Sequence, residues 1–425
     1  MVVIRVFWLF FSALASLRLE ATPVEIVFWH SLAGSLGTEL VILVEGFNRH
    51  QSVYEIKPIY KGNYIESLTS FAAAFRAKQA PALIQVFEVG TSAMLTPKGI
   101  IKAVDAVMHE AHLALPTDDF FPAVREKYSE QGQLMAMPLN ISVPVLFYNA
   151  DALKQVGYSS ENFPKTWDSL EQLANKLHQA GFACAYTSAY PAWIFIESFS
   201  ALHGLPMVNA ESGQACYNNP EVIHHLERLV AWQRLHYFEY GGRSDEATFL
   251  FTSGRCPLMS QSSGSAAGLS QAVSFKVGMA SLPMDQHASS YRHNNVTGGA
   301  ALWVVAGQTR DVYQGIAAFI AYLATPSVQA AWHRQSGYLP LGASGLYQLP
   351  NTEKVQPSLQ IAKGDWGKAP TLGYRVRWGA QDHVRAMNDE ALEAIFSGMQ
   401  SPQQAMDEAV RRANLVILRF KLNTG

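Results

Sequence analysis

One stretch, residues 54–91, constrains the fold more than any other part of this 425-residue chain. Tyr54–Tyr60 is rich in β-branched and aromatic residues and predicts a strand, and a polar turn separates it from a helical pattern that begins near Tyr64. Residues 82–87 form a nearly continuous apolar run, which is typical of a strand covered on both faces. The stretch therefore predicts a β-α-β unit. Leu68, Phe71, Ala72 and Phe75 recur at helical spacing and are expected to form its buried stripe.

An acidic residue, Glu88, stands where the second strand of this unit should end. Ligands of open α/β sheets collect at the carboxyl ends of the strands. Tyr64 and Glu88 would both lie on that edge, one crossover apart. The stretch thus predicts half of a ligand site without naming the ligand.

The residues before this stretch extend the pattern. Residues 24–29 predict a first strand and residues 38–47 a helix, so the chain begins β-α-β-α-β, which indicates a parallel sheet with right-handed crossovers. The glycines at 34 and 37 do not make a dinucleotide fingerprint, because G-x-G-x-x-G is absent from the sequence.

Length and charge narrow the class of protein. The chain is long enough for two lobes with separate cores, and 49% of its residues are hydrophobic. A formal charge of −2 gives no argument for nucleic acid or an anionic membrane as partner. Residues 1–21 combine one early positive charge, a short apolar run and small residues, which predicts a cleaved secretory signal and a periplasmic location. An apolar first strand is the alternative.

The cysteines and histidines give little indication of a metal site. An exported protein could form one disulfide from Cys184, Cys216 and Cys256, and the sequence does not choose the pair. His109 and His112 could share a helix face and bind a metal, but without a further ligand a solvated helix end is the better interpretation. The adjacent pair at 224 and 225 is expected at the surface. We expect no metal and no cofactor.

Enzyme motifs are also missing. G-x-S-x-G, P-loop and H-E-x-x-H patterns do not occur in the sequence. Glu88 with Asp389 or Glu390 could form the carboxylate pair of a glycosidase, but only residue type supports that hypothesis. The sequence therefore favours a protein that is not an enzyme.

The rest of the chain alternates between two bodies. Pro138 and Pro144 frame a polar pair within an extended apolar segment, which suggests a strand crossing between lobes. Helical patterns follow, and a hydroxyl-rich run at 260–265 precedes a helix start, where it could cap the helix or leave N–H groups for an anion. We expect a signal at 1–21, an N-terminal α/β lobe from 22–139 and 297–325, and a more helical C-terminal lobe from 140–296 and 326–425.

Several long segments, in order, resemble one family. They are FWHSLAGSLG (28–37), YKGNYIESL (60–68), APALIQVFEVGT (80–91), PLNISVPVLFYN (138–149), PKTWDSL (164–170), SSGS (262–265), GGAALWV (298–304), WHRQSGYLPL (332–341) and DEALEAIFSG (389–398). With them the chain resembles the periplasmic sn-glycerol-3-phosphate-binding proteins of bacterial ABC importers, a family of the extracellular solute-binding class that includes maltose-binding protein. The match runs nearly end to end after the signal.

The resemblance implies a fold, a function and partners. The fold is the α/β, two-lobed periplasmic-binding-protein fold of type II, maltose-binding-protein-like, with a hinge between the lobes. The function is capture of glycerol 3-phosphate, or a glycerophosphodiester, for the inner-membrane subunits of an ABC permease. An oligosaccharide ligand on the same fold and a secreted hydrolase are the alternatives. We expect a monomer that binds no nucleic acid.

The resemblance also implies the ligand contacts. They are Tyr64, Glu88, Ser142, Ser262, Gly299, Tyr338 and Arg385, with Trp193 lining the glycerol side. Arg385 would supply a fixed positive charge for phosphate, and Glu88 would accept hydrogen bonds from glycerol hydroxyls. Arg385→Ala is then expected to lose affinity with little effect on folding.

Each contact has an ordinary structural alternative, and one position departs from the family. Tyr338 and Trp193 could be core aromatics, Gly299 a turn glycine, and Arg385 the partner of Asp389 one helical turn on. Tyr190 replaces the family's tryptophan three residues before Trp193. The smaller ring could leave room for a glycerophosphodiester such as glycerophosphocholine.

Overall fold

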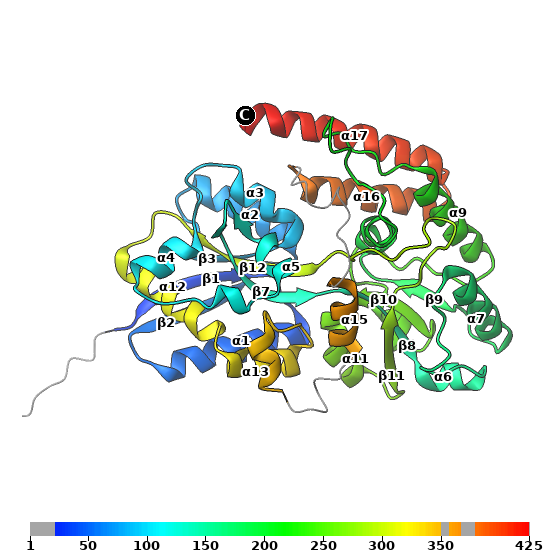
Figure 1. Ribbon diagram of the computed structural model, residues 1–425, viewed down its shortest axis with the longest axis horizontal. Coiled ribbons are helices and arrows are strands. Elements are labelled where there is room, and N and C mark those ends of the chain that lie inside the picture. Colours follow the sequence, from blue (N-terminus) through cyan, green and yellow to red (C-terminus); the bar gives the residue numbers. More distant parts are fainter. Residues whose placement is uncertain (1–21, 350–356, 367–378, 425) are drawn as a thin grey trace, which may run out of the picture.

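Two β-sheets, each with helices of its own, organise the chain into two lobes (Figure 1). The computed structural model describes residues 22–349, 357–366 and 379–424, so the predicted signal at 1–21 lies outside the described residues. Helix and strand alternate in both lobes, as the expected α/β class requires.

The first sheet begins as the sequence predicts. β1 (Val24–His30) pairs in parallel with β2 (Tyr54–Tyr60) and with β3 (Leu83–Phe87). α1 (Gly34–His50) and α2 (Tyr64–Arg76) make the two crossovers. The predicted β-α-β-α-β start is therefore confirmed. On α2, however, Phe71 is buried and Ala72 is exposed, because only a narrow face of this helix packs on the sheet.

A late segment completes the first sheet. β12 (Gly298–Val305) lies antiparallel to β3, with Ala300 opposite Phe87, and also pairs with β4 (Ile101–Lys102) and β7 (Met137–Ser142). The first lobe is thus built from two separated parts of the chain. β12 brings its glycine-rich start to the edge of the sheet where β3 ends.

The second sheet has the order β11-β8-β10-β9. Its strands are β8 (Pro144–Asn149), β9 (Tyr186–Ser188), β10 (Leu258–Ser262) and β11 (Val277–Ser281). A separate short hairpin pairs β5 (Ser129–Glu130) with β6 (Gln133–Leu134).

The chain crosses between the sheets at Val143, which lies between β7 and β8. The Val143 N–H donates to Ser263 Oγ at 3.1 Å, and the Ser263 N–H donates to Val143 O at 2.9 Å. The crossing strand expected between Pro138 and Pro144 is therefore confirmed. Its backbone is held by two hydrogen bonds to the residue after β10.

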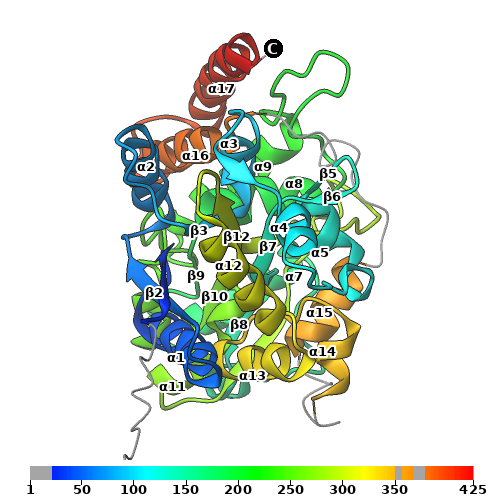
Figure 2. The same cartoon turned by 90° about the vertical axis from the view of Figure 1, so that its left-hand side faces the viewer.

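Short helical segments that are not α-helices lie at Glu88–Gly90, Thr117–Asp119, Ala192–Ser198 and Ser263–Ser265. The remaining α-helices follow in chain order. They are α3 (Thr91–Leu95), α4 (Val104–Glu110), α5 (Pro122–Lys127), α6 (Ala150–Gln155), α7 (Trp167–Gln179), α8 (Phe199–Leu202), α9 (Pro220–Arg234), α10 (Thr248–Thr252), α11 (Ala266–Ala272), α12 (Arg310–Leu323), α13 (Pro326–Ser336), α14 (Ala343–Tyr347), α15 (Pro357–Trp366), α16 (Gln381–Phe396) and α17 (Pro402–Thr424). α16 and α17 lie side by side along one edge of the molecule, with α17 outermost in both views (Figures 1 and 2).

The return to the first lobe extends further than residue 325. Trp332 and Leu339 are buried against the first sheet, whereas the sequence assigned residues from 326 onward to the second lobe. Trp332 Nε1 donates to Leu139 O at 3.0 Å and the Leu339 N–H donates to Ile141 O at 2.8 Å. These bonds to β7 hold the segment against the first sheet, and the hydrophobic cluster of the second lobe receives α16 and α17.

His225 corrects another expectation. It is fully buried, and its ring stacks on Phe199 with centroids 4.1 Å apart, although the sequence placed the histidine pair at the surface. Val222 and Leu229 lie three residues before and four residues after it on α9, so it occupies the apolar face of that helix. Its neighbour His224 is exposed, as expected.

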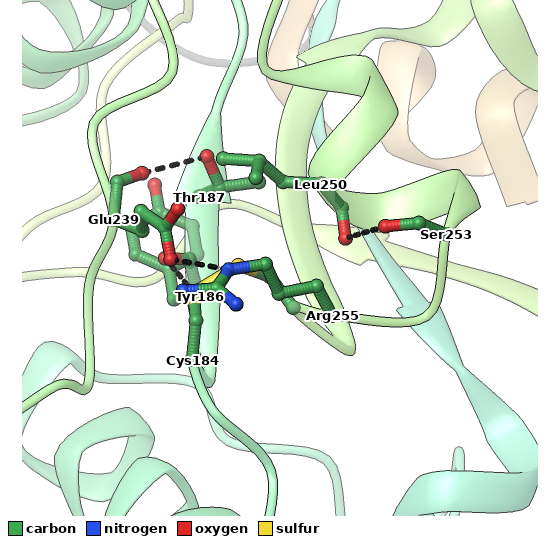
Figure 3. The surroundings of a disulfide bond; sticks show 8 residues. Cys184, Tyr186, Thr187, Glu239, Leu250, Ser253 and Arg255 are labelled. Atoms are coloured by element: carbon green, nitrogen blue, oxygen red, sulfur yellow. Dashed lines mark hydrogen bonds and ion pairs between the residues drawn. A yellow bond between two sulfur atoms is a disulfide. The ribbon is translucent and has the colours of Figure 1, made fainter.

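A disulfide joins Cys184 to Cys256 and leaves Cys216 as a thiol (Figure 3). The bond ties the segment before β9 to the segment before β10, two neighbouring strands of the second sheet. Beside it, Arg255 Nε donates to Glu239 Oε2 at 2.7 Å (Figure 3). Within the described residues, no helix has both the length and the apolar character that crossing a membrane requires.

Candidate ligand-binding site

A cavity of about 510 Å³ lies between the lobes and is lined by residues of both. All nine predicted site residues line it, namely the eight contacts that the family resemblance implies and Tyr190, which departs from the family: Tyr64, Glu88, Ser142, Tyr190, Trp193, Ser262, Gly299, Tyr338 and Arg385. The volume falls in the range of about 300–1,000 Å³ that is usual for small-molecule sites. Residues up to 321 positions apart in the chain, Tyr64 and Arg385, thus meet at one place.

The start of α2 positions Tyr64. Asn63 Oδ1 accepts from the N–H groups of Ile65 and Glu66, and Glu66 Oε2 accepts from the Asn63 N–H at 2.9 Å. This capping box fixes the first turn of the helix. The Tyr64 ring stacks on Phe87, the last residue of β3, with planes 4° apart. Tyr64 and Glu88 therefore lie at the same sheet edge, as the sequence predicted.

Asn140 aligns two phenol groups and was not singled out from the sequence. It is fully buried on β7, and its Oδ1 accepts from Gln85 Nε2 at 2.8 Å. Its Nδ2 donates to the Tyr64 hydroxyl at 3.2 Å, and its side chain also hydrogen-bonds the Tyr338 hydroxyl. Because the Asn140 amide donates to both phenol oxygens, the phenol protons remain free to point at a ligand.

The two phenols stay protonated. Burial raises the pKa of Tyr64 well above its usual range, and burial raises the pKa of Tyr338 to about 12 against the opposing hydrogen bond from Asn140. Both therefore act as O–H donors at neutral pH. Tyr338 is 6% exposed, and its ring lies directly on Gly264, where an added Cβ would come within 2.4 Å of it.

The paired glycines at the start of β12 allow close backbone approach. Gly298 lies opposite Ser142 and Gly299 opposite Ile141. Gly299 has a φ of +111°, and a Cβ there would lie 1.6 Å from Asn140 O. Only glycine suits this position, so its role exceeds that of an ordinary turn residue.

Ser262 ends β10 and caps the short helix Ser263–Ser265. Its Oγ accepts from the Gly264 N–H at 3.2 Å, so the serine run caps a helix, and the Ser262 O–H remains able to donate into the cavity. Ser142 and Ser262 stand on either side of the crossing at Val143. Hydroxyls from both sheets therefore face the same cavity.

Trp193 and Tyr190 form an aromatic wall. Trp193 is 5% exposed, its ring lies against Gly298, and its Nε1 has no hydrogen-bond partner among the described residues. Tyr190 has a φ of 47°, and its N–H donates to Ser244 O at 2.6 Å. This bond brings the loop around Ser244 to the cavity wall.

Arg385 is held by two carboxylates. Its Nε donates to Glu197 Oε1 at 2.7 Å, its Nη2 donates to Glu197 Oε2 at 2.5 Å, and its Nη1 lies 2.7 Å from Glu88 Oε1. Among the described residues its ion-pair partners are thus Glu88 and Glu197, where the sequence suggested Asp389. The charge of Arg385 is therefore balanced within the protein. Each Nη keeps one further N–H for a ligand.

Four more charged residues line the cavity, and only Asp389 among them was a candidate from the sequence. The others, Arg243, Asp245 and Glu246, follow the glycines at 241 and 242. Paired glycines before a polar run were the available signal. Arg243 Nε donates to Glu393 Oε2 at 2.7 Å.

Asp389 has an unusual environment. Burial, with the nearby Glu197 charge, raises the pKa of Asp389 to about 7 against the opposing charge of Arg385. The other carboxylate considered with it, Glu390, lies away from the cavity and pairs with Arg412 at 2.7 Å. His109 lies in the last turn of α4, whereas His112 lies beyond the helix with a φ of 55°, so the two do not share a helix face.

Sequence comparison places the chain. Residues 43–356 match the family model described as bacterial extracellular solute-binding protein. The chain belongs to this family. The solute-binding protein is 38% identical over 410 residues to the sn-glycerol-3-phosphate-binding periplasmic protein UgpB of Yersinia enterocolitica, a match that covers 93% of each chain. It is also 38% identical to UgpB of Escherichia coli over 412 residues, 94% of each chain.

Solved structures agree on the fold. UgpB from Mycobacterium tuberculosis in complex with glycerophosphocholine superposes with a TM-score of 0.77 at 21% identity, covering 95% of this chain and 100% of that one. Maltose-bound MalE3 of T. maritima gives a TM-score of 0.78 at 18% identity, covering 92% and 100%. The predicted maltose-binding-protein-like fold is therefore confirmed. Periplasmic binding proteins are the relatives of this chain.

Proposed function

We propose that this protein is a periplasmic solute-binding protein that captures sn-glycerol 3-phosphate or a glycerophosphodiester for an ABC importer. One observation carries the proposal. The eight residues that match the ligand motifs of the family come from segments far apart in the sequence, and together with Tyr190 they line one cavity between two lobes. The names of the relatives, at 38% identity over nearly the whole chain, point to the same ligand class.

The cavity offers hydrogen-bond donors that suit a phosphate. The Tyr64, Tyr338 and Ser262 hydroxyls already accept from protein N–H groups, so each has an O–H to donate. Trp193 Nε1 is a further donor without a partner among the described residues. An anion that accepts several such bonds is held without a surplus of positive charge.

In this proposal Arg385 contributes N–H donors in fixed directions more than it contributes net positive charge. Its guanidinium is oriented by Glu197 and Glu88, so the N–H groups that remain point in fixed directions. Glu88, which is 5% exposed, can accept from a glycerol hydroxyl while it holds Arg385. The glycerol and phosphate parts of one ligand would thus meet neighbouring groups of a single network.

Transport follows from ligand contact with both lobes. Tyr64 and Glu88 lie at the edge of the first sheet, and Ser262 and Arg385 belong to the second lobe, so a bound ligand favours the closed arrangement. A permease can then distinguish loaded from empty protein. We propose that the protein acts as a monomer, performs no bond chemistry, and is exported by a signal at residues 1–21 that is removed.

Calorimetric titration of the purified protein with glycerol 3-phosphate, glycerophosphocholine and maltose tests the proposal. We expect binding of at least one of the two phosphates and none of maltose. Binding of maltose alone would replace the proposal with an oligosaccharide-binding protein, and turnover of a glycerophosphodiester that is lost in Glu88→Gln would replace it with a hydrolase. Tyr190→Trp should shift the affinity ratio toward the smaller phosphate.

A further inference from the structure

The wall of the cavity is acidic, although its expected ligand carries a phosphate. Four carboxyl groups line it, on Glu88, Asp245, Glu246 and Asp389, against two guanidinium groups. A dianionic phosphate ester alone would add to this negative charge, and like charges at close range repel strongly outside bulk water. The charges of the wall therefore suit a ligand that carries a cation as well as a phosphate.

The two cations of the wall are balanced by further carboxylates. Arg385 is paired with Glu88 and Glu197, and Arg243 is paired with Glu393. Among the described residues Asp245 and Glu246 have no ion-pair partner, whereas Asp389 lies within the influence of Arg385, which lowers its pKa against the effect of burial. In Asp245 the side chain is exposed and makes no hydrogen bond within the described part of the chain.

The unbalanced carboxylates gather around Tyr190, the position that departs from the family. The loop that carries Asp245 and Glu246 is tied to Tyr190 by the bond between its N–H and Ser244 O. Both carboxylates act electrostatically on the Tyr190 hydroxyl. Asp389 is also close, because the N–H of Ala192, two residues on from Tyr190, donates to its carboxylate.

Two unpartnered polar atoms point to a ligand independently of the charges. Asp389 Oδ1 is buried and has no hydrogen-bond partner among the described residues, and the same holds for Nε1 of Trp193, whose side chain is 95% buried. Both side chains line the cavity. A buried polar atom without a partner is costly, so a ligand that meets both atoms gains affinity.

We propose that Asp245, Glu246 and Asp389 form a subsite for the positively charged head group of a glycerophosphodiester. This inference rests on the function proposed above and narrows its ligand class. In a phosphodiester of choline or ethanolamine, a two-carbon bridge separates the ammonium from the phosphate. Arg385 and Asp389 lie four residues apart on α16, and side chains at that spacing are about 5–6 Å apart. One helix face thus presents an N–H donor and a carboxylate at a separation that matches the zwitterion.

The aromatic wall supports the same head group. Tyr190 and Trp193 line the cavity beside the carboxylates, and an ammonium over such a ring is attracted by its electron-rich face. A tyrosine at 190 leaves more room there than the family's tryptophan would. We expect the protein to bind diesters with a cationic head group more tightly than diesters with a neutral head group. Both should bind more tightly than glycerol 3-phosphate.

Calorimetry with matched ligands tests this subsite on the full mature chain. Glycerophosphocholine and glycerophosphoethanolamine carry a cation, whereas glycerophosphoglycerol has the same phosphodiester without one. We expect Asp245→Asn to weaken binding of the two cationic diesters by up to about fivefold, as for an exposed ion pair, and Asp389→Asn by about tenfold or more. Binding of glycerophosphoglycerol should be unchanged or stronger in both variants. Glu161→Gln, which removes an exposed carboxylate outside the cavity, should change no affinity.

The outcomes separate this subsite from the proposed function. If the unmodified protein binds glycerol 3-phosphate or glycerophosphoglycerol as tightly as the cationic diesters, the subsite is refuted and the proposed function stands. If both variants bind all diesters more weakly by the same factor, the carboxylates do not recognise the head group, and the subsite is again refuted. If no phosphate ligand binds at all, the proposed function fails first. Asp245→Asn keeps the test valid should Asp389→Asn fold poorly, because Asp245 is exposed and makes no bond that folding requires.

Discussion

Removal of the Arg385 guanidinium should destabilise the folded protein, contrary to the sequence-based expectation that folding would be little affected. The side chains of Arg385, Glu197 and Glu88 are 15%, 14% and 7% exposed, so the cluster lies mostly out of water. Arg385→Met would leave two carboxylates without their cation. Breaking a buried pair in this way costs about 3–5 kcal/mol, and we expect that decrease in the free energy of unfolding.

The same cluster predicts a compensating variant. In Glu88→Gln/Arg385→Met/Glu197→Gln all three charges are absent, and replacing buried ions by neutral groups is often close to neutral for stability. We therefore expect the triple variant to recover most of the loss. Each single glutamine variant should cost less than Arg385→Met, because the other carboxylate still balances the arginine.

Urea unfolding followed by far-ultraviolet circular dichroism measures both effects, with Arg411→Met as control. Arg411 is an exposed arginine that pairs with Glu408 three residues earlier on α17, so its loss should cost far less stability than the loss of Arg385. The reasoning is refuted if Arg385→Met unfolds at the same urea concentration as the unmodified protein. It is also refuted if the triple variant is less stable than Arg385→Met.

Three further predictions concern pH and the disulfide. Burial lowers the pKa of His203 to about 4, and its Nε2 accepts from the Asp285 N–H at 2.7 Å, so protonation opposes folding. The stability contribution of neutral His203 is complete above pH 6.5 and falls as pH drops toward 4, by about 3 kcal/mol, measured by urea unfolding at each pH. Loss of the Cys184–Cys256 disulfide, which closes a separation of 72 residues, should lower the free energy of unfolding by about 2–4 kcal/mol in the double serine variant. Burial raises the pKa of Asp389 to about 7, so the affinity for glycerophosphocholine relative to glycerophosphoglycerol should rise about fivefold from pH 6 to pH 8, followed by calorimetry.

Each of these has a control and a contradicting result. The pH dependence of stability should be weaker in His203→Gln, and an unchanged slope between pH 6.5 and 4 contradicts the role of His203. Cys216→Ser should leave the free energy of unfolding unchanged. If this variant loses as much stability as the double serine variant, the loss does not come from the Cys184–Cys256 disulfide. In Asp389→Asn the ratio of affinities should not vary with pH, and a variation that persists excludes Asp389 as its source.

The fold was predictable where local pattern and burial agree. The alternation of strand and helix patterns through residues 24–91 predicted the start of the first sheet, because each β-α-β unit has a characteristic alternation of these patterns in the sequence. Residues 326–339 were assigned to the second lobe, whereas they bond to β7 of the first sheet, because helices of either lobe carry the same apolar periodicity. Only long-range hydrogen bonds, such as that from Trp332 Nε1 to Leu139 O, show to which lobe such a helix belongs.

The candidate site shows the same division. Motif resemblance found eight of the residues that line the cavity and drew attention to Tyr190, and the sequence alone could place only Tyr64 and Glu88 at a common edge. Asn140 was passed over, because a buried amide that orients two phenols has no local signature. The partners of Arg385 were also out of reach, since Glu197 is 188 positions away in the chain and lies on a helix with an apolar pattern.

The two bonds between Val143 and Ser263 determine which parts of a ligand sense movement of the lobes. Both backbone groups of Val143 are tethered to the second lobe, while Ser142 remains in the ladder of the first sheet, so this crossing can bend only at the peptide between them. Ser142 and Ser262 adjoin this peptide, and a rotation about it changes their separation little. Groups further from this peptide move further for the same angle. The contacts of Ser142 and Ser262 with the phosphate would therefore be similar in the open and closed forms. Contacts at the opposite end of the ligand would form only when the lobes close.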